Sequence, residues 1–272
     1  MSRRGSRFPD ADHRQVHGWR STFLALTVSA ALLPAAACGV PYDPPTPVGT
    51  SSADTVVPGG SDPTVEPAAA RSGAAAAALA KLPVKGRAPK TGYTREQFGQ
   101  RWADIDKDGC DQRNQVLARD MDKETFKPGT KNCVVLTGSL RDPYTARTIA
   151  FTRGADSSSD VQIDHVIALS DAWQKGAQQL DAATRQRIGN DPLNLVAVDG
   201  PTNARKGDGD AATWLVPNTK YRCAYVSRQV AVKARYKLWV TAAERDAIGK
   251  ILDTCPGQAL PTDANAPANT FR

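Results

Sequence analysis

The spacing of hydrophobic positions changes several times along the chain, and each change predicts an element. Residues 133–144 and 147–154 are apolar and β-branched on either side of a turn at Asp142 and Pro143, which predicts two short strands. The runs 161–169 and 193–200 have the same character and predict two more strands. Between these runs the spacing lengthens to a helical period over about 170–191. The patterns together predict an α+β fold.

Helix starts are signalled where a threonine precedes a Glu or Gln by three residues, because the two side chains can satisfy free amides of the first turn. Thr94 with Gln97 predicts a helix over about 95–103, and Thr241 with Glu244 predicts one over about 241–255. A further helix is expected to begin at residue 201 or 202, where proline suits the first turn. The neighbourhoods of three tryptophans are apolar and periodic, which favours core positions for Trp173, Trp214 and Trp239.

The first part of the chain is typical of an export signal followed by a spacer. Residues 1–37 combine five arginines with a short apolar run and a small-residue end, so we expect a signal peptide there. The apolar run is too short for a membrane-spanning helix, which needs about 20 residues. Cys38 lies in "AAACG", which resembles a lipoprotein signal, so it is a lipidation candidate and the only expected link to a membrane. Residues 38–82 are rich in Pro, Ser, Thr and Ala and predict a disordered linker. We expect a folded domain over 83–256 and a flexible tail over 257–272.

Removal of the signal peptide changes both the charge and the histidine content. The formal charge of the 272-residue chain is +7, and the mature protein keeps about +4. Such a mildly basic protein is compatible with a polyanionic partner, although solubility alone also favours this charge. His13 and His17 leave with the signal peptide, so His165 becomes the single histidine.

The expected domain contains an even number of cysteines, namely Cys110, Cys133, Cys223 and Cys255. In an exported chain this favours disulfides. Three connectivities are possible, and sequential pairing closes the shortest loops. A zinc site does not suit the spacing, since no two of these cysteines form a C-x₂₋₄-C knuckle.

An acidic segment copies the first half of a calcium-binding loop. Asp104, Asp106, Asp108 and Gly109 have the required spacing, but the twelfth position is Gln115, where a bidentate Glu is needed. We therefore favour a turn in which the aspartates accept backbone hydrogen bonds.

The segments "IDHVIALSDAW", "NDPLNLVAV" and "NARKGD" occur in the order strand, strand and helix. With "DGCDQRN" and "DPY", they resemble the HNH, or ββα-metal, endonucleases, and most closely an exported actinobacterial-type group of that family. The resemblance extends from about Tyr93 to Cys255. It implies an HNH core embedded in a small, mostly helical, disulfide-stabilised domain.

The resemblance also implies roles for the residues of these segments. His165 would be the general base, because a neutral imidazole can take a proton from water near neutral pH. Asp164 and Asn203 would bind Mg²⁺ or Mn²⁺ through hard oxygen atoms. Asn194 would orient the histidine or its loop, although it also suits a turn residue that caps the strand after Pro192.

Lys206 and Arg205 follow Asn203 on the expected helix and would hold a substrate phosphate. For Arg205 a solvated helix end is an equally good interpretation. Consecutive strand residues face opposite sides, so Asp164 and His165 would not reach one phosphate from a regular strand. We therefore expect irregular backbone at this dipeptide.

These roles predict an exported, extracellular or cell-surface nuclease that hydrolyses phosphodiester bonds. Nothing in the sequence is typical of a base-reading helix, so we expect non-specific cleavage directed at the phosphate backbone. We expect a monomer that acts on DNA, with RNA as the open alternative. Metal-dependent hydrolysis of a small phosphodiester is a further possibility. The alternative from another class is a non-catalytic cell-surface module that binds polyanions, or calcium through the acidic segment, on a degenerate HNH scaffold.

Overall fold

The structure, a computed structural model, describes residues 73–154 and 158–262. The expected signal peptide, Cys38, most of the expected linker and the last part of the expected tail lie outside these residues. No helix of the described part combines the length and apolarity that a membrane span requires.

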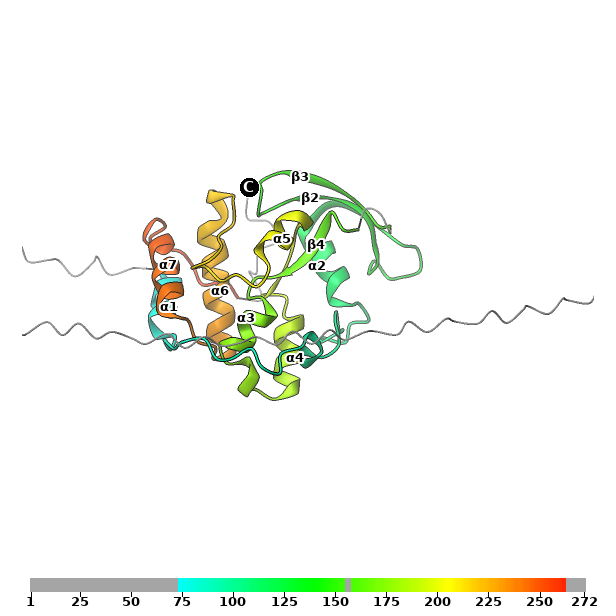
Figure 1. The fold of residues 1–272 in the computed structure, drawn as a ribbon. Helices are drawn as coiled ribbons and strands as arrows, with labels where there is room; N and C mark the ends of the chain where they lie inside the picture. The colour runs from blue at the N-terminus through cyan, green and yellow to red at the C-terminus, as the bar shows by residue number, and fades with distance from the viewer. Residues whose placement is uncertain (1–72, 155–157, 263–272) are drawn as a thin grey trace, which may run out of the picture. The chain divides into compact units, whose positions relative to one another are not determined.

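The described residues form helices around two small antiparallel sheets (Figure 1). An α+β fold is therefore confirmed. The elements follow one another as α1 (Ala74–Lys81), η1 (Arg95–Phe98), α2 (Gln112–Asp120), β1 (Met121–Phe126), β2 (Val135–Arg141), β3 (Thr148–Thr152), β4 (Val161–His165), α3 (Leu169–Gln174), η2 (Ala177–Gln179), α4 (Ala182–Asn190), β5 (Leu195–Asp199), α5 (Gly200–Lys206), η3 (Thr219–Tyr221), α6 (Arg222–Tyr236) and α7 (Ala242–Asp253).

One sheet has the order β1-β2-β3, and the other pairs β4 with β5. The expected hairpin around Asp142 and Pro143 is confirmed, since β2 pairs with β3 from Thr137↔Thr152 to Arg141↔Thr148. β4 pairs with β5 without interruption from Val161↔Asp199 to His165↔Leu195. The expectation of irregular backbone at Asp164 and His165 is therefore wrong, because the chain leaves the strand only after His165.

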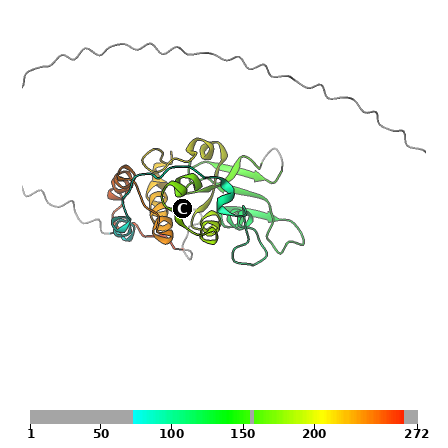
Figure 2. The same ribbon diagram turned by 60° about the horizontal axis from the view of Figure 1, so that its bottom comes forward.

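The β4–β5 sheet lies between two hydrophobic clusters, so both of its faces are buried. Val196 and Val198 pack with α1, α6 and α7, whereas Leu195 and Ala197 pack with α2 and the larger sheet. Both views place α1, α6 and α7 together, apart from the three-stranded sheet (Figure 1 and Figure 2). Burial on both faces explains why β5 is a continuous apolar run instead of an alternating one.

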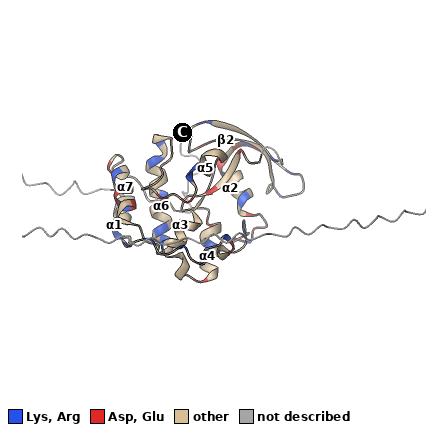
Figure 3. Ribbon diagram, in the orientation of Figure 1, with Lys and Arg blue, Asp and Glu red and all other residues tan. Residues whose placement is uncertain are grey.

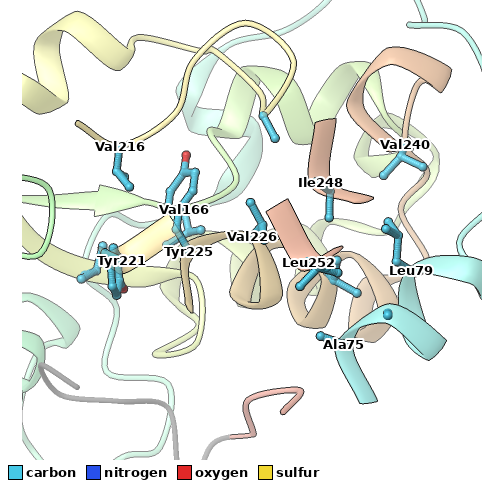
Figure 4. Packing of buried hydrophobic residues seen from close by; sticks show 14 of the residues in the cluster. Ala75, Leu79, Val166, Val216, Tyr221, Tyr225, Val226, Val240, Ile248 and Leu252 are labelled. Carbon is cyan, nitrogen blue, oxygen red and sulfur yellow. The ribbon is translucent and has the colours of Figure 1, made fainter. Parts of the chain in front are cut away.

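The folded unit begins before the expected boundary at residue 83. α1, assigned from sequence to the linker, packs against α6 and α7 and buries Ala75 and Leu79 (Figure 4). The amide of Ala75 donates to the carbonyl of Gln258 at 3.1 Å, and Leu260 packs against the core. The boundary at residue 256 is therefore also too early.

The helix expected over 95–103 is reduced to the single 3₁₀ turn η1. Thr94 makes no side-chain cap to a backbone amide of this turn, and Gly99 follows it at φ 71°. Trp102 also has a positive φ, of 58°, so the chain cannot continue as a helix. Phe98 is the buried residue of the turn.

The other local expectations agree with the structure. The helical region 170–191 contains α3 and α4, and α5 begins beside Pro201. The capping box of Thr241 and Glu244 is present at α7. Trp173 and Trp239 are buried, and Trp214 is partly buried against the core. The disulfides are sequential, Cys110–Cys133 and Cys223–Cys255.

A buried ionic cluster joins α3, α7 and the segment after α5. The Nζ atom of Lys175 lies 2.7 Å from carboxylate oxygens of Asp171, Asp210 and Glu244. Burial acts to raise the pKa of Asp210, but the hydrogen bond and charge of Lys175, together with Arg87, outweigh burial and lower this pKa to about 2. The cluster therefore holds three separate segments at one buried point.

Candidate active site

His165 is buried at the end of β4, where one ring nitrogen is fixed by the backbone of α4. Its Nε2 lies 2.9 Å from the carbonyl oxygen of Gly189. A carbonyl only accepts hydrogen bonds, so Nε2 carries the hydrogen and the lone pair of a neutral ring lies on Nδ1. The imidazole also stacks on Trp102, with 6.1 Å between ring centroids and 9° between planes. Tautomer and ring orientation are thus both determined by neighbours.

Burial lowers the pKa of His165 to about 3, against the opposing effect of its bond to Gly189. The positive charges of Arg95, Lys206 and Arg101 lower this pKa further. The ring is therefore neutral at physiological pH, as a proton acceptor must be.

Asp164 points to the opposite face of β4 and is held by two buried donors. The hydroxyl of Tyr144 donates to Oδ2, and the Nζ atom of Lys206 lies 2.9 Å from Oδ1 and 2.8 Å from Oδ2. Burial, then the charge of Asp164, raises the pKa of Tyr144 well above its ordinary value, so the phenol keeps its proton. Both carboxylate oxygens therefore have protein partners.

Lys206 lies on α5 with its side chain fully buried, and its Nζ also donates to the carbonyl oxygen of His165 at 2.7 Å. In this arrangement the ammonium that we expected on a substrate phosphate is engaged by Asp164 and the backbone. Arg205 is exposed and donates to the hydroxyl of Thr202, one turn earlier, at 2.7 Å.

Asn194 is completely buried and joins the two segments on either side of His165. Its Oδ1 accepts from the amide of Ile167 at 2.8 Å, and its Nδ2 donates to the carbonyl of Ile188 at 3.1 Å. Ile167 follows His165 by two residues, and Ile188 precedes Gly189. One amide group thus connects the loop after the histidine to the backbone that binds its ring.

Two hollows meet at His165. The Asn203 hollow, of about 380 Å³, is bordered by Asp164, His165, Asn203 and Arg95. The Arg101 hollow, of about 290 Å³, is bordered by Arg95, Arg101, His165 and the backbone of Gly189. The side chain of Asn203 is half-buried and its Nδ2 donates to Gln162 at 2.9 Å. Asp164 and His165 therefore border the same hollow although their side chains leave β4 on opposite faces.

Several parts of this site were missed by sequence reasoning. Tyr144 belongs to the quoted "DPY" segment, but nothing in its pattern indicates contact with Asp164. Trp102 lies in the segment that was expected to form a helix, and Arg95 and Arg101 were given no role. The carbonyl of Gly189 carries no side-chain signal at all.

The acidic segment forms the expected turn. Asp104 accepts from the amides of Asp108 and Gly109 at 3.2 and 2.9 Å, and Asp108 accepts from Cys110 at 2.7 Å. Oxygen atoms of the three aspartates lie within 4.8 Å of one another. The side-chain amide of Gln115 donates to two of them, at 3.0 and 2.8 Å, where a calcium loop has a Glu carboxylate.

Comparison with known proteins identifies a nuclease family. A family model described as the C-terminal domain of GmrSD restriction endonucleases matches residues 111–251, which is more than half of the chain. A protein of Arthroderma benhamiae described as "Uncharacterized secreted protein" is 36% identical over 179 residues, which cover 65% of this chain and 82% of that protein. No solved structure matches. The expected nuclease resemblance is thus confirmed at the level of a family, whereas its actinobacterial part is not supported.

Proposed function

Because the chain belongs to the family of the GmrSD restriction endonuclease C-terminal domain, we propose that it is a metal-dependent nuclease with an HNH-type site. It hydrolyses phosphodiester bonds of nucleic acid, with His165 as the general base. The observation that carries the proposal is the hydrogen bond from His165 Nε2 to Gly189, because it leaves Nδ1 to accept a proton from water.

Asn194 is the positioning residue of the proposed site. Its bonds to Ile167 and Ile188 hold the two backbone segments that determine where the imidazole lies. A general base must stay within hydrogen-bond reach of the attacking water, so loss of this connection lowers the rate without removing the base.

Asp164 and Asn203 offer oxygen atoms of the type that Mg²⁺ and Mn²⁺ prefer, and both border the hollow that contains His165. These oxygen ligands suit a divalent cation. The site offers it little net negative charge, however, because the ammonium of Lys206 already neutralises Asp164. When bound there, the metal supplies positive charge to the phosphate and to the departing oxygen. We propose that a substrate phosphate offsets the charge of Lys206, and that metal binding is weak without substrate.

The proposed substrate is DNA, and the proposed active form is a monomer. Cleavage has no sequence preference, since the described fold has no evident base-reading element. We also propose that residues 1–37 direct export and that Cys38 carries a lipid anchor. The relative described as secreted and the two disulfides support an extracellular location.

The direct test is cleavage of plasmid, single-stranded DNA and RNA by the purified mature protein across divalent metals, with and without EDTA. His165→Ala and His165→Phe should both lose nearly all cleavage. The Phe variant keeps an aromatic ring against Trp102, so unchanged melting of this variant separates chemistry from folding. Cleavage retained by either folded variant would rule out His165 as the base.

A further inference from the structure

Four arginines form a row that begins at the candidate active site. Arg95 and Arg101 border the Arg101 hollow beside His165. Arg113 lies on α2, and Arg153, which directly follows β3, donates to the side-chain oxygen of Asn114, the next residue of α2. Figure 3 shows basic residues in blue on α2 and around it. We call Arg95, Arg101, Arg113 and Arg153 the arginine row.

The positive charges of the arginine row are poorly compensated. Within the described part of the chain, the guanidinium groups of Arg95, Arg101 and Arg113 form no ion pair and no hydrogen bond, and Arg101 lies 5.0 Å from the ring of Trp102. Arg153 donates to the carbonyl of Val135 at 2.6 Å and to the side-chain oxygen of Asn114, and both acceptors are neutral. A ligand with closely spaced negative charges would therefore meet several free donors.

The members of the row also repel one another. Burial lowers the pKa of Arg113, and the charges of Arg153 and Arg101 lower it further, with Asp111 opposing them. The pKa of Arg101 is lowered by burial and by the charge of Arg95. The charge of each arginine thus acts on the next, and an anion along the row would relieve this repulsion.

One end of the arginine row lies beside His165, the proposed general base. Arg95 borders both hollows together with His165, so one end of the row lies where the reacting phosphate must bind. Arg101 lies over Trp102, which stacks on His165. The cations of α5 are less available to a substrate strand than the arginine row, because Lys206 is buried and Arg205 is hydrogen-bonded to Thr202.

We propose that the arginine row binds the phosphate backbone of the nucleic acid on one side of the scissile bond. The substrate strand leaves His165 past Arg101 and continues over α2 toward the end of β3. This inference rests on the proposed function for the position of the reacting phosphate. Phosphate contacts carry no base information, so the row binds polymers of any sequence.

The test uses two double variants. The row variant combines Arg101→Gln and Arg113→Gln, and the matched control combines Arg245→Gln and Lys250→Gln on α7. Both remove two positive charges, and the control residues are exposed. Binding of a short fluorescent DNA, single-stranded or duplex, is measured by anisotropy in EDTA over a series of salt concentrations. EDTA separates binding from cleavage.

The row variant should bind at least about tenfold more weakly, because it loses two charged hydrogen-bond donors to phosphate. The slope of log affinity against log salt should become shallower by about 1.8 with duplex, or about 1.4 with single-stranded DNA. Lysine at both positions should keep the slope, and the control pair should change it little. The row variant should melt no lower than the wild type, since it loses mutual repulsion.

A small phosphodiester separates the row from the catalytic residues. Hydrolysis of bis(p-nitrophenyl) phosphate should continue in the single variant Arg113→Gln, because this substrate has a single phosphate at His165 and Arg113 borders neither hollow there. An unchanged salt slope in the row variant refutes phosphate binding by the arginine row, even if cleavage is normal. An equal loss of slope in the control pair refutes it as well. If the salt slope becomes shallower in Arg205→Gln and not in the row variant, the substrate strand follows α5 and the proposal is wrong. Loss of slope in a protein that hydrolyses no phosphodiester supports the row and overturns the proposed function.

Discussion

Lys206→Met removes the ammonium that neutralises Asp164 and leaves the buried carboxylate with the hydroxyl of Tyr144 as its remaining side-chain donor. Removal of one partner from a buried ion pair costs about 3–5 kcal/mol, because the other charge stays uncompensated. The folded unit has about 190 residues, and unfolding entropy is about 2.1 cal/mol/K per residue near 60 °C, or about 0.4 kcal/mol/K in total. The melting temperature should therefore fall by about 10 °C.

The assay is thermal unfolding of the mature protein with and without MnCl₂. Lys250→Met, an exposed lysine on α7, is the matched control and should melt like the wild type. Because Mn²⁺ can replace the missing positive charge at Asp164, it should raise the melting temperature of Lys206→Met more than that of the wild type. A variant that melts within about 2 °C of the wild type would refute the importance of the ion pair. An equal response to Mn²⁺ in both proteins would refute the proposed metal position.

Three further predictions concern other parts of the fold. Asn194→Ala leaves the buried Ile167 amide unsatisfied, so urea unfolding should show a loss of about 1–3 kcal/mol, and a loss near zero would contradict the positioning role. Replacement of Cys223 and Cys255 by alanine opens a loop with a sequence separation of 32 and should cost about 3.7 kcal/mol, measured in the same way. Unchanged stability would mean that this crosslink does not stabilise the fold. The lowering of the Asp210 pKa from 3.8 to about 2 contributes at most about 2.5 kcal/mol of stability, which is present above about pH 4 and is lost as the pH falls through 2. The free energy of unfolding of Asp210→Asn, measured between pH 5 and 2, should lack this loss. The same pH dependence in the variant and the wild type would contradict the lowered pKa of Asp210.

Elements with local signals were predictable from the sequence. The hairpin of β2 and β3, the apolar run of β5 and the capping box of α7 each depend on neighbouring residues. α6 was not predicted, although it is 15 residues long, because its charged residues obscure the apolar face. Arg228 of this helix is buried and donates to the carbonyls of Leu193, Pro192 and Leu195, so a residue that suggests a surface is part of the interior. β1 was missed because an edge strand with exposed Asp122 and Lys123 has little apolar signal.

The candidate site was predictable in part. Adjacent Asp164 and His165, with the later asparagines, were found because their residue types and order are informative. The structure places Asp164, His165 and Asn203 around one hollow and Asn194 behind the histidine loop. The partners that determine their state are distant in sequence: Tyr144 precedes Asp164 by 20 residues, and Gly189 follows His165 by 24. Such contacts depend on how the sheets and helices pack, which a local pattern does not specify.

The contact between Ala75 and Gln258 has a consequence for how this unit can be combined with other chains. Its first helix and its last described segment are hydrogen-bonded to each other, so the polypeptide enters and leaves the fold at one point. A unit with adjoining ends can be inserted into a surface loop of another protein, or permuted by joining those ends, with short connecting segments. The fold can in this respect be moved as one unit, and we expect the candidate active site to keep its geometry in such a fusion.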